Sequence, residues 1–284
     1  MHAYLILAHN NFGVLKKLIQ MLDHESNDLY IHIDKSVKDF DFEYYKSIAS
    51  KSCVYFTDRV NISWGDYSMV KAEYLLLKKA HENHHRYKYY HLISGVDLPL
   101  KTADELHAFF DAQYPKEFIH FAKSMNNIEL SRVKHYHFFT GRRNIFNRLM
   151  TKAEQFFQTI LGVNRVKKTK VARGSQWFSI SDDFVRYLLD NEKQIKKRLR
   201  FTFIPDEFFV QLAAVNSRFA DNLYCDRFDN SNEQNMRLID WTRGHPYTFN
   251  EEDFDEIMNS GCMFARKLTD DNKLPDMIFE RISK

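Results

Sequence analysis

Two adjacent carboxylates, Asp206 and Glu207, follow Pro205 and precede an apolar segment with helical spacing. A proline followed by acidic residues is typical of the start of a helix. A carboxylate fixed there, beside apolar side chains, could act as a general base that takes a proton from a hydroxyl. The same two acids could instead only complement the partial positive charge at the helix N-terminus. The local sequence leaves both interpretations open.

The N-terminal part of the chain predicts the elements that would position a substrate. Residues 3–8 and 29–33 are continuous apolar runs, typical of buried strands, and residues 14–22 between them have helical spacing. This order predicts two parallel strands with a right-handed crossover. Ligands of such sheets bind at the carboxyl ends of the strands, which is where His9 and Asp34 stand. Asp34 could equally be a turn residue.

Further strands are predicted over residues 54–56, 89–94, 118–121 and 174–180, with helical patterns between them. Gly95 permits a tight turn after the strand over 89–94, and Asp97 emerges just beyond it. Short strands are expected over 237–241 and 263–267. The sequence therefore predicts an α/β fold with a mostly parallel central sheet flanked by helices.

The composition limits the class of protein. The 284 residues are 44% hydrophobic with only 8 Gly and 5 Pro, so we expect one domain over 1–284 without long flexible linkers. The net charge of +3 does not by itself indicate nucleic-acid binding. Three well-separated cysteines indicate reduced thiols, and no signal peptide or 18-residue apolar run is found. We expect a cytoplasmic protein that is at most peripheral to a membrane.

Residues 141–173 form a basic insertion, with nine Lys or Arg against one acid, Glu154. An apolar patch made of Phe156, Phe157, Ile160 and Leu161 lies between the basic clusters. The segment could be a solvated excursion with one packed helix. Alternatively, it could be a basic amphipathic segment that contacts the inner face of an anionic plasma membrane or a phosphorylated substrate.

Metal-binding motifs are weak in this sequence. Residues 81–85 match the zinc motif H-E-x-x-H, but they stand at the polar end of a helical pattern and no distant third ligand is evident. Two D-x-D strings, at 39–41 and 253–255, do not follow apolar strands, where a hard cation would need its oxygen ligands. We therefore predict no metal and no other cofactor, and expect Arg243 and Lys267 to neutralise a phosphate.

Six short motifs, taken together and in this order, resemble one known family. They are Tyr4-Leu5-Ile6-Leu7-Ala8-His9, Ile31-His32-Ile33-Asp34-Lys35, Ser63-Trp64-Gly65, Leu92-Ile93-Ser94-Gly95-Val96-Asp97-Leu98-Pro99, Gly174-Ser175-Gln176-Trp177-Phe178 and Pro205-Asp206-Glu207. This series is similar to that of the core-2/I-branching β-1,6-N-acetylglucosaminyltransferases, a family that also contains peptide O-xylosyltransferases. The resemblance runs from about residue 3 to residue 268.

The resemblance implies a GT-A-like glycosyltransferase fold and an inverting, metal-independent transfer from a UDP-sugar to a glycan hydroxyl. It implies that Glu207 is the catalytic base. The expected donor-binding residues are His9, Asp34, Trp64, Asp97, Gly174, Ser175, Arg243 and Lys267. The expected acceptor-binding residues are Glu129, Arg132, His135, Trp177 and Trp241, although either tryptophan could simply pack in the core.

The chain departs from the Golgi members of that family, because it lacks their membrane anchor and their set of cysteines. The departures favour a bacterial-type, cytoplasmic member with an acceptor that could be lipid-linked. The resemblance makes GlcNAc the expected donor sugar, in bacterial surface polysaccharide synthesis. Xylose or another UDP-sugar is an alternative donor. A non-catalytic glycan- or lipid-binding protein is another alternative, which Glu207 argues against. Nucleic-acid binding through residues 141–173 is disfavoured by the mild net charge.

Overall fold

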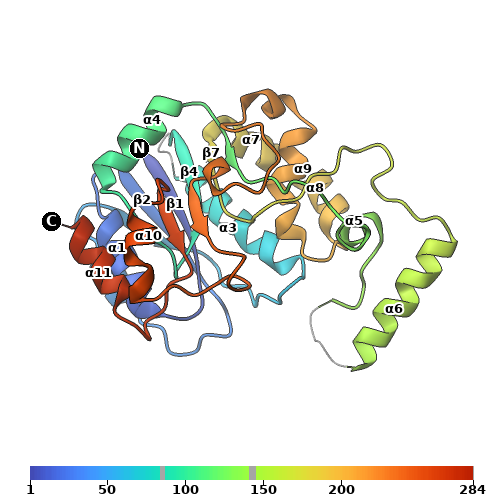
Figure 1. Ribbon diagram of the computed structural model, residues 1–284, viewed down its shortest axis with the longest axis horizontal. Helices are drawn as coiled ribbons and strands as arrows, with labels where there is room; N and C mark the ends of the chain where they lie inside the picture. The colour runs from blue at the N-terminus through green and yellow to red at the C-terminus, as the bar shows by residue number, and fades with distance from the viewer. Residues whose placement is uncertain (84–86, 141–144, 284) are drawn as a thin grey trace.

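The computed structural model describes residues 1–83, 87–140 and 145–283 (Figure 1). His84 and His85 of the zinc-like motif lie outside the described residues, as do residues 141–144 of the basic insertion.

A six-stranded sheet forms the centre of the fold, in the order β3-β2-β1-β4-β7-β6. Its strands are β1 (His2–Ala8), β2 (Asn27–Ile33), β3 (Cys53–Phe56), β4 (Tyr89–Ser94), β6 (Phe118–Ile119) and β7 (Phe178–Ser181). β1 pairs in parallel with β2 and β4, and β2 pairs in parallel with β3, as the strand–helix–strand pattern predicts. The predicted α/β class is confirmed.

The sheet is more mixed than expected, because β7 pairs antiparallel to both β4 and β6. The chain reaches β7 after a long excursion over residues 120–177. For two strands to pair in parallel, the connection between them must bring the chain back to the end of the sheet where the first strand began, as a crossover helix does. This excursion does not bring the chain back to that end. The sequence shows the strand but not its direction.

Helices cover both faces of this sheet (Figure 1). On β1, Ala3, Leu5 and Leu7 face one hydrophobic core, which also contains side chains of α3 (Ser68–Glu82), α7 (Asp182–Asp190) and α9 (Phe209–Val215). Tyr4, Ile6 and Ala8 face the other core, which contains side chains of α1 (Phe12–Leu22), α4 (Ala103–Gln113) and α11 (Leu274–Ile282). Burial on both faces explains why the strand is a continuous apolar run.

A second, three-stranded sheet brings the C-terminal part of the chain to the end of β4. Its order is β5-β9-β8, formed by β5 (Leu98–Pro99), β9 (Phe264–Arg266) and β8 (Arg237–Ile239). β5 follows β4 almost at once and pairs antiparallel to β9. The backbone N–H of Leu268 also donates to the carbonyl of Val96, over 3.0 Å. These pairings fix the residues after β9 beside the carboxyl end of β4.

The remaining elements are short, apart from α6. They are α2 (Phe42–Ser47), α5 (Asn127–Lys134), α6 (Ile145–Ile160), α8 (Glu192–Leu199), α10 (Phe254–Met258) and the 3-10 turns η1 (Pro205–Glu207), η2 (Arg218–Asn222), η3 (Asn232–Gln234) and η4 (Glu251–Asp253). α6 extends at the end of the molecule away from the main sheet (Figure 1). In the described part of the chain, no helix combines the length and the apolar character needed to cross a bilayer.

Candidate active site

A cleft of about 310 Å³ opens at the carboxyl ends of β1, β2 and β4. Its lining includes His9 after β1, Asp34 after β2 and Gly95 after β4, as expected for ligand binding in a parallel sheet. Gly95 is needed there, because a Cβ atom at this position would lie 2.8 Å from the Cβ of Ala8. Trp64, also predicted from its motif, lines the same cleft.

Asp34 is held as a fixed hydrogen-bond acceptor. Its carboxylate accepts from the amide of Ser36 at 2.7 Å, from the hydroxyl of Ser36 at 2.5 Å and from the amide of Ile62 at 2.8 Å. Burial opposes ionisation of this carboxyl, but these hydrogen bonds outweigh burial and lower its pKa. Asp34 is therefore both the turn residue and the cleft residue that the sequence left as alternatives.

Two consecutive cations, Arg266 and Lys267, line the cleft at the end of β9. The guanidinium of Arg266 donates to Asp97 at 2.9 Å and lies 4.4 Å from the ring centroid of Trp177. Asp97 is buried and also accepts from the hydroxyl of Ser94 at 2.6 Å, so it positions Arg266 at the cleft wall. Arg266 was not predicted as a site residue. The signal for it was the pair of cations directly after a strand.

The structure does not bring Arg243 to this cleft. Its guanidinium forms ion pairs with Asp240, with Asp253 at 2.6 Å and with Glu256 at 2.9 Å. The hydrogen bond from Arg243 holds the pKa of Asp240 well below its usual range. With three carboxylates around it, this arginine compensates local negative charge and is not placed to meet a ligand in the cleft.

A second cavity, of about 690 Å³, contains Glu207. Gly174 and Ser175 line this cavity, whereas the next two residues, Gln176 and Trp177, line the first cleft. One four-residue segment thus separates the two spaces. Gly174 and Ser175, predicted beside the donor, therefore lie on the Glu207 side, and Trp177, predicted beside the acceptor, lies on the other. Trp241, predicted beside the acceptor, lines the Glu207 cavity.

Two arginines orient the carboxylate of Glu207. Its Oε2 accepts from Arg132 at 3.1 Å and from Arg173 at 3.0 Å, and Arg173 also pairs with Glu129 at 2.8 Å. Both bonds reach the same oxygen. Within the described residues, Oε1 has no hydrogen-bond partner in the structure, so it can accept one from a substrate hydroxyl. His135, the third predicted residue of this region, is buried at the C-terminal end of α5 and does not line the cavity.

The backbone around Glu207 is tightly fixed. The predicted helix start is a 3-10 turn, η1, which follows Ile204 in the left-handed conformation (φ 56°) and precedes α9. The amide of Gly174 donates to the carbonyl of Glu207 at 2.9 Å. A Cβ atom at residue 174 would lie 1.7 Å from the carbonyl oxygen of His120, so only glycine permits this approach.

Two further carboxyl groups, Asp206 and Glu73, are buried behind Glu207. Burial, followed by the charge of Glu207, raises the pKa of Asp206 to about 7. Burial and the nearby Asp206 likewise raise the pKa of Glu73 well above its usual value. Glu73 accepts from the side-chain amide of Gln176 at 2.7 Å, so this pair also supports the segment between the two cavities. Glu73 could not be recognised from the sequence, because it stands within an ordinary helical pattern.

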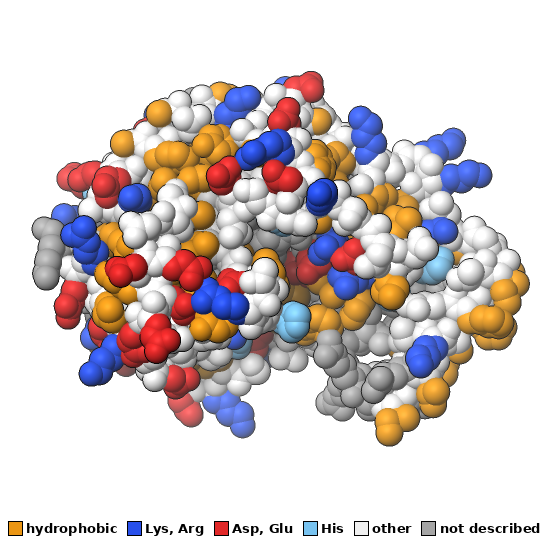
Figure 2. Space-filling model, viewed as in Figure 1, with side chains coloured by type: hydrophobic (Ala, Val, Ile, Leu, Met, Phe, Trp, Pro, Cys, Tyr) orange, Lys and Arg blue, Asp and Glu red, His pale blue; other side chains and the backbone are white. Residues whose placement is uncertain are grey.

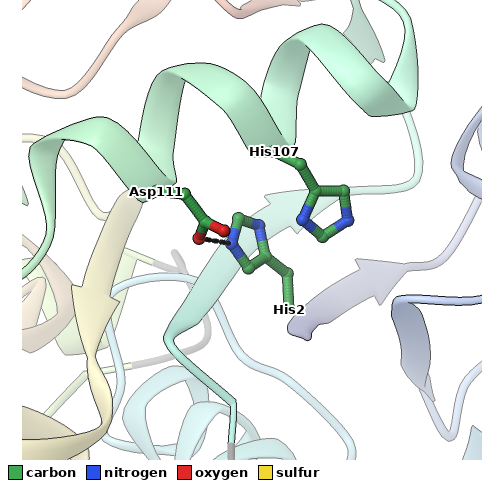
Figure 3. Close-up of side chains that lie close together, drawn as sticks. All are labelled: His2, His107 and Asp111. Atoms are coloured by element: carbon green, nitrogen blue, oxygen red, sulfur yellow. Dashed lines mark hydrogen bonds and ion pairs between the residues drawn. The ribbon is translucent and has the colours of Figure 1, made fainter.

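His2, His107 and Asp111 lie together at the opposite end of β1, with possible ligand atoms within 4.8 Å of one another (Figure 3). The two rings are packed against each other, with centroids 4.1 Å apart and planes tilted by 38°. Asp111 bonds His2 at 3.1 Å and the ammonium of Lys88 at 2.9 Å. Burial, then His107, lowers the pKa of His2 to about 3. We assign this cluster a structural role at this end of the sheet, because Asp111 already bonds His2 and Lys88, and His107 bonds Asn27.

Comparison with known proteins places these features in a family. The family model described as "Branch: Core-2/I-Branching enzyme" matches residues 2–259. The chain belongs to the Core-2/I-Branching enzyme family. This confirms the resemblance drawn from the six motifs.

Among curated relatives, this Core-2/I-Branching family member is 25% identical to xylosyltransferase 2 of Rattus norvegicus over 93% of its length. It is 23% identical to xylosyltransferase 1 of Homo sapiens, again over 93% of its length. The chain spans 31% and 28% of these two relatives, less than a third of each.

The similar solved structures share less sequence identity with this chain than the curated relatives do. Mouse xyloside xylosyltransferase 1 gives a TM-score of 0.39 at 11% identity, with 93% of this chain and 96% of that chain covered. Core-mannan synthase A from Aspergillus fumigatus gives 0.42 at 10% identity, with 78% and 71% covered.

The buried carboxyl of Asp206 makes stability depend on pH. Its pKa is about 7 in the folded chain against 3.8 ordinarily, so between these values the folded state holds a proton that the unfolded state releases. The contribution of this group to the free energy of unfolding therefore falls as pH rises, by up to about 1.4 kcal/mol per pH unit. Asp206→Asn should remove that contribution. Its free energy of unfolding relative to wild type should thus increase between pH 5 and 8, measured by urea denaturation.

The exposed Asp58 supplies the control. Asp58→Asn should give a pH profile parallel to that of wild type. A parallel profile for Asp206→Asn as well would show that Asp206 does not hold a proton in the folded chain.

Proposed function

We propose that this chain is an inverting glycosyltransferase that moves a sugar from a UDP-sugar to a hydroxyl of a glycan. The observation that carries the proposal is the pair of cavities on either side of residues 174–177. The first cleft lies at the carboxyl ends of parallel strands and contains the two cations Arg266 and Lys267, which suits a nucleotide diphosphate. The other contains an oriented carboxylate, which suits an acceptor hydroxyl. Family membership supports this division.

In the proposed reaction Glu207 takes the proton from the acceptor hydroxyl as the hydroxyl oxygen attacks C1 of the donor sugar. The bond between C1 and the diphosphate oxygen breaks, and UDP leaves with that electron pair. A single attack inverts the configuration at C1. Arg266 and Lys267 stabilise the negative charge that develops on the leaving diphosphate. Arg132 and Arg173 hold the base in place.

The donor sugar we propose is GlcNAc, on the family resemblance, with an acceptor in bacterial surface polysaccharide synthesis. Xylose is the second candidate, and the curated relatives named xylosyltransferases favour it. The two donors differ by the substituents at C2 and C5 of the sugar, so assays with both UDP-sugars distinguish them.

We also propose that transfer needs no metal ion. Among the described residues that line the first cleft, Asp34 is the one carboxylate, and three hydrogen bonds already occupy it. Asp97, the other acid nearby, is bonded to Arg266. A Mg²⁺ or Mn²⁺ ion prefers several free oxygen ligands, whereas a diphosphate can be neutralised by Arg and Lys directly.

Replacing the base tests the catalytic assignment. Glu207→Gln keeps an oxygen for the two arginines but cannot accept a proton, so transfer should fall by about 10²- to 10⁴-fold. The affinity for UDP, measured by isothermal titration calorimetry, should stay unchanged because Glu207 lies outside the first cleft. Glu25→Gln is the matched control and should leave transfer unchanged, since Glu25 is exposed and lines neither cavity. Normal turnover by Glu207→Gln would contradict the proposal that Glu207 is the catalytic base.

Release of UDP from a panel of UDP-sugars, with EDTA present and no acceptor, tests the donor site. Slow hydrolysis of one donor should persist in EDTA and identify the sugar. Lys267→Ala should weaken UDP binding about tenfold, because it removes one of the two cations. Hydrolysis that appears only with Mn²⁺ would contradict the metal-free site. Absence of both hydrolysis and UDP binding would favour a non-catalytic binding protein.

A further inference from the structure

The helix α6 is attached to the rest of the molecule by its polar side. Gln158 is buried; its side-chain oxygen accepts from the amide of Tyr136 at 2.7 Å, and its side-chain nitrogen donates to the carbonyl of Tyr136 at 2.8 Å. Glu154 accepts from the amide of Phe138 at 3.1 Å. An amphipathic helix of a globular protein ordinarily does the opposite and turns its apolar side inward.

The apolar side of α6 faces solvent. Six large hydrophobic side chains on and just after the helix are between 61% and 78% exposed: Ile145, Leu149, Phe156, Phe157, Ile160 and Leu161. Ile145, Leu149, Phe156 and Ile160 share one face by their spacing. Figure 2 shows hydrophobic side chains along the outer edge of α6, with Lys and Arg side chains close by at this end of the molecule. A contiguous apolar face of this kind marks an interaction surface.

The charges of the segment indicate what covers this face. Lys152 is exposed and stands between Leu149 and Phe156 on the same side of the helix. Lys167, Lys168 and Lys170 are exposed in the segment that follows. The one acid of residues 141–173, Glu154, is turned inward to Phe138. A second copy of this chain would bring the same positive charges together, whereas anionic lipid headgroups would neutralise them.

We propose that α6 and Lys167, Lys168 and Lys170 dock on the surface of an anionic lipid bilayer. The apolar face of α6 enters the boundary between headgroups and acyl chains, and the lysines lie at the headgroups. The docking segment begins with α6 at Ile145, 13 residues after Arg132, and ends at Lys170, three residues before Arg173; these are the two arginines that hold Glu207. Docking therefore turns the end of the molecule that carries these two arginines toward the lipid surface. Taken with the proposed function, on which this last step rests, it favours an acceptor carried on a lipid.

Vesicle co-sedimentation with the full chain tests the docking and needs neither donor nor acceptor, so its result is independent of the transferase proposal. The chain should bind vesicles of phosphatidylcholine mixed with phosphatidylglycerol, and bind weakly to phosphatidylcholine alone. The double variant Phe156→Ser and Phe157→Ser should lower the partition coefficient at least about tenfold. These side chains are exposed, so circular dichroism should show an unchanged fold. Lys167→Gln with Lys168→Gln should reduce binding mainly at low salt.

Tyr44→Ser provides the control, because Tyr44 is an exposed aromatic residue on α2, outside the docking segment, and binding should be unchanged. Equal binding by wild type and the double phenylalanine variant would overturn the proposal, as would the absence of binding to mixed vesicles. A wild-type dimer in analytical ultracentrifugation that the double variant dissociates, without vesicle binding, would also overturn it and assign the face to a second copy of the chain.

Discussion

The position of the Glu207 carboxylate depends on two guanidinium groups that approach it from different parts of the chain. Arg132 comes from α5, and Arg173 comes from the end of the basic insertion. A single carboxylate oxygen bonded to both has little freedom to rotate. The backbone of the same residue is fixed by Gly174, where only a hydrogen atom fits against His120. Glu207, the end of the basic insertion and residues 174–177 therefore form one fixed structural unit.

This unit explains how the two cavities relate to each other. Residues 174–177 carry Gly174 and Ser175 on the Glu207 side and Gln176 and Trp177 on the side of the cations. Trp177 supports Arg266, and Gln176 bonds the buried Glu73. In the proposed reaction the sugar passes this segment, and a segment held in this way would keep donor and acceptor in a fixed orientation. The buried carboxyls of Glu73 and Asp206 lie directly behind it.

The main parts of the fold could be predicted from local patterns. The continuous apolar strands at residues 3–8 and 29–33 determined the parallel centre of the sheet, and with it the place of His9 and Asp34. The antiparallel direction of β7 could not be predicted, since it depends on where a long excursion returns. The surroundings of Arg243 and Trp177 could not be predicted for a related reason. Their surroundings are set by contacts between distant segments, such as the three acids around Arg243, and spacing in the sequence does not show these.

The most direct test of this account is a crystal structure of the chain with UDP bound. We predict that the uridine lies beside Asp34 and that the diphosphate contacts Arg266 and Lys267, with its terminal phosphate directed toward residues 174–177. A diphosphate bound in the cavity lined by Trp241, or at Arg243, would contradict the division into a donor cleft and an acceptor cavity on which the role of Glu207 rests.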